Sequence, residues 1–314
     1  MKIKKILIGI LILTMVFTVG CTGSKASEQE QQQETVTEEP KNFSLKVGLM
    51  PAVDAAPMLI AEKKGYLREL GLDVELIVFN NAQDRQSALQ TNSIDGAMTD
   101  LIAVATNVNG GFDIRATTIT SGMFPVLVKE GYTEKKDIKV AMMEVSVTNF
   151  LIDEWLGNDY NIEKVFINEI PARLEMIKSG NVDMGLFPEP MASMGALGGL
   201  EKRIYDPEDG YCPDVLGFTS KALTEKAEAI KLFHEAYDKA VEDINKDESI
   251  AREILIEKLA LKPEIKDSMI LPKYTKASLP DNAYLEKIIS WVEDVLKKDM
   301  NIKPEQLVER KFVE

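Results

Sequence analysis

The feature that most limits the fold of this chain is an alternation of short apolar segments with amphipathic ones. The apolar runs, rich in Val, Ile and Leu, are typical of β-strands, and the segments between them space apolar side chains as helices do. Such alternation is typical of α/β layers. It occurs in two successive rounds, 45–120 and 126–205, so the sequence predicts an α/β protein with two lobes.

The pattern locates the elements of both lobes. Strands are expected at 45–50, 74–79, 94–98, 114–120, 126–129, 139–143, 164–167, 182–186, 202–205 and 215–219. Helices are expected at 58–70, 84–90, 101–108, 148–156, 172–179, 191–197, 223–245, 249–261 and 282–298. We assign 44–120 and 214–314 to the first lobe, which the C-terminal helices cover, and 121–213 to the second lobe. The first crossing between lobes is expected at Ser121 and Gly122.

The N-terminus indicates export. Three lysines, Lys2, Lys4 and Lys5, precede the apolar run 6–20, which is shorter than the roughly 20 residues that span a bilayer. The run ends at Cys21, so residues 1–21 are predicted to be a lipoprotein signal peptide. The alternative is an ordinary signal peptide with an incidental cysteine.

The residues around Cys21 favour lipidation of its thiol. Gly20 fits the small residue before the cysteine of a lipobox, whereas Thr18 stands where a leucine is usual. Cys21 would then become the mature N-terminus and anchor the protein to the membrane. The polar segment 22–43 is too poor in apolar residues to fold, and we expect a disordered tether that spans on the order of 25 Å.

Composition excludes several classes of function. The net charge of −14 argues against nucleic-acid binding. Cys212 is the one other cysteine, so no disulfide is expected within the mature chain, and His234 is the one histidine. We expect His234 to be an ordinary residue of an amphipathic helix. We therefore expect no catalytic residue, no metal ion and no cofactor.

Several short strings, in a coherent order and spacing, resemble solute-binding proteins of ABC importers. They are 46–50 (KVGLM), 56–57 (AP), 61–67 (AEKKGYL), 71–76 (GLDVEL), 94–99 (IDGAMT), 177–184 (IKSGNVDM) and 187–190 (FPEP). The similar branch handles nitrate, taurine, aliphatic sulfonates and thiamine-pyrimidine precursors. The resemblance implies a type II periplasmic-binding-protein fold with a ligand cleft between lobes. It also implies a monomer that captures a small solute outside the cytoplasm and delivers it to the permease and ATPase of an importer.

Open α/β sheets bind ligands beyond the carboxyl ends of their strands, and this rule selects the candidate site residues. Most of the candidates lie in the loops that follow predicted strands, and three lie at the crossing between lobes. The candidate ligand-binding residues are Asp54, Ala55, Ala56, Asn80, Asn81, Thr99, Asp100, Thr118, Thr120, Ser121, Glu144, Ser146, Thr148, Asn149 and Glu189.

Glu189 is the sharpest of these candidates, because the prolines on both sides of it restrict its backbone. Its alternative role is to stabilise a helix dipole in the first turn. Asp100, Ser146 and Thr148 could instead be helix N-caps, and Asp54 could be a turn residue.

The charges of the candidate loops favour a cationic or neutral nitrogenous solute over an anion. Only Arg85 and Arg173 offer positive charge near these loops, and burying several carboxylates around an anion would be costly. Trp155 and Trp291 lie outside the loops, which argues against an aromatic cage. The acidic candidates are Asp54, Asp100, Glu144 and Glu189.

Two other functions are open. Cytosolic pyrimidine-precursor synthases and menaquinone-pathway dehydratases resemble the same scaffold, so an enzyme is one alternative. The export signal and the helical position of His234 argue against it. The second alternative is a surface lipoprotein that senses a solute for a separate signalling partner.

Overall fold

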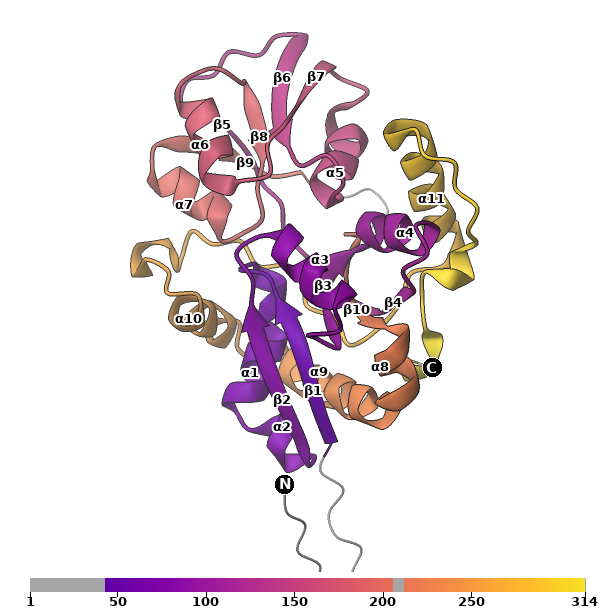
Figure 1. Cartoon of the computed structure of the whole chain (residues 1–314). Coiled ribbons are helices and arrows are strands. Elements are labelled where there is room, and N and C mark those ends of the chain that lie inside the picture. Colours follow the sequence, from indigo (N-terminus) through magenta and orange to yellow (C-terminus); the bar gives the residue numbers. More distant parts are fainter. Residues whose placement is uncertain (1–42, 206–211, 314) are drawn as a thin grey trace, which may run out of the picture. The chain divides into compact units, whose positions relative to one another are not determined.

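The first sheet has two strands, β3 and β10, that are buried along their whole length, and a more exposed edge strand, β2. The computed structural model describes residues 43–205 and 212–313 (Figure 1). Its first sheet has the order β2-β1-β3-β10-β4, in which β1 pairs in parallel with β2 and β3. The last strand in sequence, β10, runs antiparallel between β3 and β4. The bounds are β1 (Phe43–Leu49), β2 (Leu72–Val78), β3 (Gly96–Asp100), β4 (Ile114–Ile119) and β10 (Asp214–Thr219).

The second sheet is formed by the chain between β4 and β10. Its order is β7-β6-β8-β5-β9, with β6 parallel to β7 and β8, and β5 antiparallel to β8 and β9. Within the described residues the chain therefore forms two five-stranded sheets, and the predicted mixed α/β fold with two sheets is confirmed. The bounds are β5 (Val126–Lys129), β6 (Asp137–Met142), β7 (Asn161–Phe166), β8 (Met184–Leu186) and β9 (Leu200–Arg203).

Helices connect the parallel strands and follow the last strand. Those of the two rounds are α1 (Ala56–Lys63), α2 (Tyr66–Glu69), α3 (Ala82–Gln90), α4 (Leu101–Asn109), α5 (Val147–Leu156), α6 (Ile170–Lys178) and α7 (Met191–Leu197). After β10 come α8 (Ser220–Glu225), α9 (Ala227–Lys246), α10 (Ser249–Lys258) and α11 (Asn282–Leu296). Short 3-10 turns are η1 (Val53–Ala55), η2 (Pro263–Ile265), η3 (Pro304–Gln306) and η4 (Arg310–Phe312).

Two helices predicted as continuous are each divided in two. The segment 58–70 breaks at Gly65, whose φ of +82° lies in the left-handed region that glycine adopts easily. The segment 223–245 breaks at Lys226, whose backbone leaves the helical region at φ −127° and ψ 26°. The Nζ of Lys226 donates a hydrogen bond to Asp95 at 2.8 Å, which ties this break to the start of β3.

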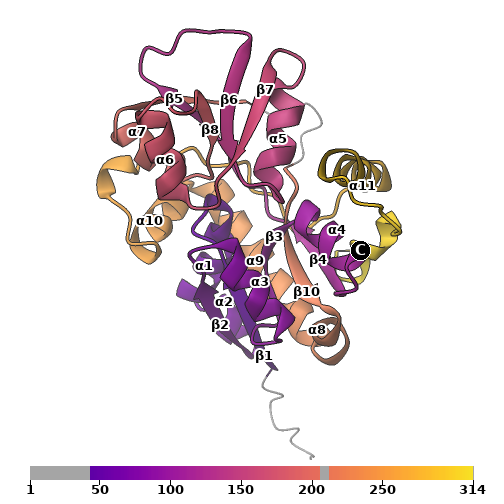
Figure 2. The same cartoon turned by 45° about the horizontal axis from the view of Figure 1, so that its top comes forward.

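The C-terminal helices cover the first sheet, as predicted, and α11 also reaches the second. The buried face of α9 packs on α1 and β1, and α10 packs on α1. Both views place α11 next to α4 and α5 (Figures 1 and 2). There the rings of Phe150 and Trp291 meet edge to face at 5.6 Å, and Trp291 Nε1 donates to Asp153 at 2.9 Å. The C-terminal segment therefore contacts elements of both sheets.

Two sequence predictions concern parts of the chain outside the strand-end loops, namely His234 and the N-terminal segment. His234 is buried on α9, with Nε2 3.0 Å from the hydroxyl of Thr117, so it is part of the protein interior as expected. The predicted signal peptide, the lipidation site Cys21 and the tether 22–43 lie outside the described residues, apart from Phe43. In the described part of the chain, no helix has the length and apolar character needed to cross a membrane.

Candidate functional site

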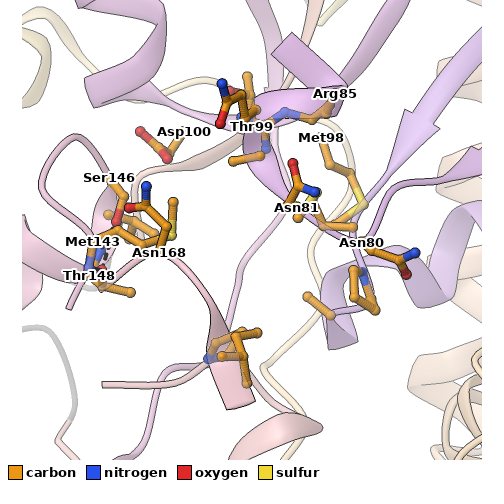
Figure 3. Close-up of a pocket in the computed structure, with 18 of the residues that line it drawn as sticks. Asn80, Asn81, Arg85, Met98, Thr99, Asp100, Met143, Ser146, Thr148 and Asn168 are labelled. Atoms are coloured by element: carbon orange, nitrogen blue, oxygen red, sulfur yellow. Dashed lines mark hydrogen bonds between the residues drawn. The ribbon is translucent and has the colours of Figure 1, made fainter. Parts of the chain in front are cut away.

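A cavity of about 290 Å³ is lined by loops from both sheets, at the carboxyl ends of their parallel strands (Figure 3). The first sheet contributes loops after β1, β2 and β3, and the second contributes loops after β6, β7 and β8. The lining residues are Met50, Pro51, Ala52, Asp54, Asn80, Asn81, Ala82, Gln83, Asp84, Arg85, Met98, Thr99, Asp100, Phe124, Met143, Val145, Ser146, Val147, Thr148, Asn168, Glu169, Ile170, Pro171, Arg173, Pro188 and Asp214.

The structure brings about half of the candidate residues to this cavity. Figure 3 shows Ser146 and Thr148 on one side of the space, with Asn80 and Asn81 across from them. These positions follow from the strand ends that the sequence pattern identified. The candidates that line the cavity are Asp54, Asn80, Asn81, Thr99, Asp100, Ser146 and Thr148.

The remaining candidates lie outside the lining. Thr118 Oγ1 and the backbone of Ser278 exchange hydrogen bonds, which ties β4 to a C-terminal segment. Asn149 Nδ2 donates to the carbonyl oxygen of Glu144 at 2.7 Å and so closes the loop before α5. The candidates placed outside the lining are Ala55, Ala56, Thr118, Thr120, Ser121, Glu144, Asn149 and Glu189.

Glu189 is buried completely, and its carboxylate is engaged by other parts of the protein. Its Oε1 accepts from Lys202 Nζ at 2.6 Å, from the Ser193 hydroxyl at 3.0 Å and from the backbone N–H of Ile270 at 3.2 Å. Lys202 Nζ also donates to the carbonyl of Ser268 at 2.6 Å. The structure therefore places Glu189 in a network that joins the second sheet to the segment after η2, and not in the cavity.

Helix capping and cavity lining coincide at three positions. The side chains of Asn81, Asp100 and Ser146 accept hydrogen bonds from backbone N–H groups at the starts of α3, α4 and α5, at 2.8 to 3.0 Å. Asp100 and Ser146 are thus the N-caps that the alternative interpretation described, and they also line the cavity. Thr148 lies inside α5, where its hydroxyl accepts from the backbone N–H of Met143.

Two buried carboxyl groups, those of Asp54 and Asp214, lie beside the segments that connect the two sheets. Asp54 Oδ2 accepts from the hydroxyl of Thr120 at 2.7 Å, whereas Oδ1 is buried and has no hydrogen-bond partner in the described part of the chain. Burial raises the pKa of Asp54 to about 6. Burial, with repulsion from Asp54 and Asp100, raises the pKa of Asp214 well above its ordinary value.

Two buried arginines complete the charge pattern. Burial lowers the pKa of Arg85, although Asp100 and Asp214 oppose that effect. Arg173, from the second sheet's side, donates to the carbonyl of Leu186 at 2.8 Å, and burial lowers its pKa to about 10. The Nε atoms of both arginines are buried without a hydrogen-bond partner within the described residues. The cavity therefore presents acceptors and donors that a solute could satisfy.

The sequence interpretation missed several lining residues, of which Asp214 is the most informative. Because β10 runs antiparallel to β3, its first residue lies at the sheet edge where β3 ends. An antiparallel strand is hard to recognise without its pairing, so no local signal identified this position. Met98, Phe124 and Met143 were also missed, since apolar residues at strand ends resemble core residues.

The described residues offer no resident metal site, since no group of three His, Cys, Asp or Glu side chains among them could hold a metal ion. The candidate site is therefore a cavity lined by hydrogen-bonding and charged side chains, without a metal ligand cluster in the described part of the chain.

No curated protein matches the sequence. Comparison with protein families gives a positive result: residues 38–196, just over half of the chain, match the NMT1-like family.

The chain belongs to the NMT1-like family. Solved structures extend the comparison to the fold of this NMT1-like protein. The ligand-binding component of an ABC-type import system from Staphylococcus aureus, with zinc bound, superposes with a TM-score of 0.74 at 16% identity, over 86% of this chain and 97% of that one. The periplasmic aliphatic sulphonate-binding protein of Escherichia coli gives 0.67 at 16% identity, over 85% and 97%.

A nitrate-binding protein has a more distant likeness. The periplasmic nitrate-binding protein of Synechocystis PCC 6803 gives a TM-score of 0.57 at 16% identity, over 72% of this chain and 68% of that one. At these identities the likeness establishes the fold. The resemblance found in the sequence is therefore confirmed for family and for the periplasmic-binding-protein fold of the NMT1-like protein.

Proposed function

We propose that this NMT1-like protein is the solute-binding component of an ABC importer and that the cavity between its sheets is the solute site. The observation that carries the proposal is the cavity itself, because loops from two separate sheets line it together. A solute that contacts both sets of loops would favour the closed arrangement of the two lobes to the extent that it binds that arrangement more tightly. The structural neighbours, which are ligand-binding components of importers, support this function.

A binding role also agrees with the chemistry of the lining. The single histidine is on α9 against Thr117 and lies outside the cavity lining, so it offers no general base there. The lining instead combines amides, hydroxyls, carboxylates and guanidinium groups with methionine side chains. Such a mixture of apolar surface and a few polar groups is typical of sites that hold a small molecule.

The location and partners form the finer part of the proposal. Cys21 would carry the lipid that holds the protein at the outer face of a membrane, and 22–43 would serve as its tether. The partners would be a permease and an ATPase, which receive the solute from a monomeric binding protein. Lobe closure would move one lobe, residues 44–120 with 214–314, against the other lobe, residues 121–213.

Native mass spectrometry of residues 43–314, purified from cells, tests the solute site. We expect a population with the added mass of a small molecule, which unfolding should release. Deleting the gene should then abolish uptake of the identified solute. A protein that carries no small molecule, in cells whose uptake of candidate solutes does not depend on it, would refute the transport role.

A further inference from the structure

The two carboxyl groups of Asp54 and Asp214 lie at the crossings between the sheets. Thr120, at the first crossing, donates its hydroxyl to Asp54 and its backbone N–H to the carbonyl oxygen of Asp214 at 3.0 Å. A Cβ atom at Gly122 would lie only 1.8 Å from Oδ2 of Asp214, so the crossing chain passes directly against this carboxyl. Asp214 is the first residue of β10 and marks the return crossing.

Both carboxyls line the cavity, although Asp54 is only 2% exposed and Asp214 is 7% exposed. Oδ1 of Asp54 is a buried acceptor that no described residue satisfies. Such an atom costs free energy unless a ligand or water supplies a donor. Repulsion from Asp54 and Asp100 affects Asp214 more than the attraction of Arg85 does. Arg85 therefore offsets only part of the negative charge around Asp214.

Burial makes the ionised forms of both carboxyls costly. It raises the pKa of Asp54 to about 6, and burial with repulsion from Asp54 and Asp100 raises the pKa of Asp214 well above its ordinary value. A positively charged group beside the pair would favour the ionised carboxylates. The titratable or charged groups that face the pair are Asp100, Arg85, Cys212, Tyr237 and Tyr274.

We propose that Asp54 and Asp214 bind the protonated amine of the solute, and this inference rests on the proposed solute-binding function. An ammonium group has hydrogen atoms to donate to Oδ1 of Asp54 and to the carboxyl of Asp214, which a quaternary ammonium lacks. Phe124 is the single aromatic among the lining residues that the structure describes, and these residues do not form the cage that quaternary ammonium groups require. The solute is therefore a primary or secondary amine.

The arginines define what else the solute carries. Arg85 and Arg173 each have a buried Nε without a hydrogen-bond partner in the described chain, and both line the cavity. A hydrogen-bond acceptor on the solute, such as a carboxylate, would satisfy these Nε donors. The inferred solute is an amine that also bears an acceptor, and it binds with its ammonium at the crossings.

Isothermal titration of the purified protein with three matched sets of probes tests the assignment. The first set is the ω-amino acids from glycine and β-alanine to longer members, and the others are the alkylamines and alkanoates of equal chain length. We expect at least one ω-amino acid to bind more tightly than its matched amine and alkanoate. Near pH 6, where Asp54 is partly protonated, titrations in buffers of different ionisation enthalpy should show that its binding releases protons. Affinity should consequently rise with pH as the carboxyls lose their proton.

Substitutions at Asp54 and Asp214 test whether these two side chains contact the amine. Asp54→Asn and Asp214→Asn should each weaken binding of the amino acid about tenfold or more, because a hydrogen bond to a charged partner is lost. Asp73→Asn is the matched control, since it removes one negative charge from an exposed residue of β2 that lies outside the cavity lining. Circular dichroism of each variant verifies folding, and a released proton in wild type supports the pair even if one variant does not fold.

The outcomes separate this inference from the proposed function. The assignment is wrong if alkanoates, nitrate or alkanesulfonates bind while amines do not, and the solute-binding function then survives. It is also wrong if Asp73→Asn weakens amine binding as much as the two test variants do, or if no proton is released near pH 6. The absence of binding by every probe class, together with no copurified small molecule, would contradict both the assignment and the proposed function.

Discussion

Removing the charge of Lys202 tests whether Glu189 has a structural role. Lys202→Met would leave the carboxylate of Glu189, which is fully buried, with only neutral donors. Removing one partner of a buried ion pair costs about 3–5 kcal/mol, and we expect Lys202→Met to lower the free energy of unfolding by that amount. Glu189→Gln should cost less, about 2 kcal/mol, because Lys202 keeps its bonds to Ser193 and to the Ser268 carbonyl.

Urea unfolding followed by circular dichroism measures these free energies, provided that the m-values of the variants agree. The double variant, Glu189→Gln with Lys202→Met, should cost less than the sum of the single variants, because the two side chains interact directly. Lys139→Met is the matched control, since its ion pair with Glu163 is exposed and should contribute at most about 1 kcal/mol. A cost for Lys202→Met no greater than that of Lys139→Met would refute the buried-network interpretation.

Solute binding by the same Glu189→Gln variant distinguishes a structural role of Glu189 from the ligand-binding role that its sequence context indicates. Glu189 lies outside the cavity lining, so the variant should bind the solute with unchanged affinity when folded. If calorimetry instead finds a large loss of affinity while the free energy of unfolding stays constant, Glu189 contacts the solute as the sequence pattern indicated.

Three further predictions concern other parts of the chain. Burial lowers the pKa of His234 from 6.5 to about 4, so between these pH values the unfolded chain binds more protons than the folded protein does. The free energy of unfolding should therefore fall by about 3 kcal/mol as the pH drops through this range, and urea unfolding of His234→Gln should show a weaker dependence on pH. Gly122→Ala should destabilise the protein by about 1–3 kcal/mol in urea unfolding and weaken solute binding in calorimetry, because the new Cβ collides with the Asp214 carboxyl. Cys21→Ala should abolish incorporation of labelled fatty acid and partition into detergent; continued labelling would contradict the lipoprotein prediction.

The order of strands and helices could be predicted because burial imposes a local pattern on the sequence. Strands such as β5 (126–129) and helices such as α7 (191–197) begin and end where the pattern indicated. The pattern does not report pairing between distant strands, so it could not reveal that β10 inserts between β3 and β4. Nor could it show that Trp291 of α11 reaches Asp153 of α5, since that contact depends on how two helices far apart in sequence are placed.

Glu189 illustrates how much of a residue's environment a local argument leaves open. Its position after a strand and between two prolines correctly located it near the sheet edge, and Pro188 does line the cavity. The direction of its side chain, however, is set by donors that come from elsewhere. Lys202 on β9 and the N–H of Ile270 after η2 donate hydrogen bonds to the carboxylate. Only the tertiary structure brings these donors together.

Asp100 shows that a capping role and a ligand-binding role are not exclusive alternatives. One oxygen of its carboxylate accepts from the N–H of Ala103 and so begins α4, while the residue also lines the cavity. In a parallel sheet, the residue that caps a helix follows directly after a strand, and this is the edge where ligands bind. The same geometry therefore selects Asp, Ser and Asn for both purposes. A cap of this kind is held rigidly by its backbone donor, which favours its use for positioning a bound solute.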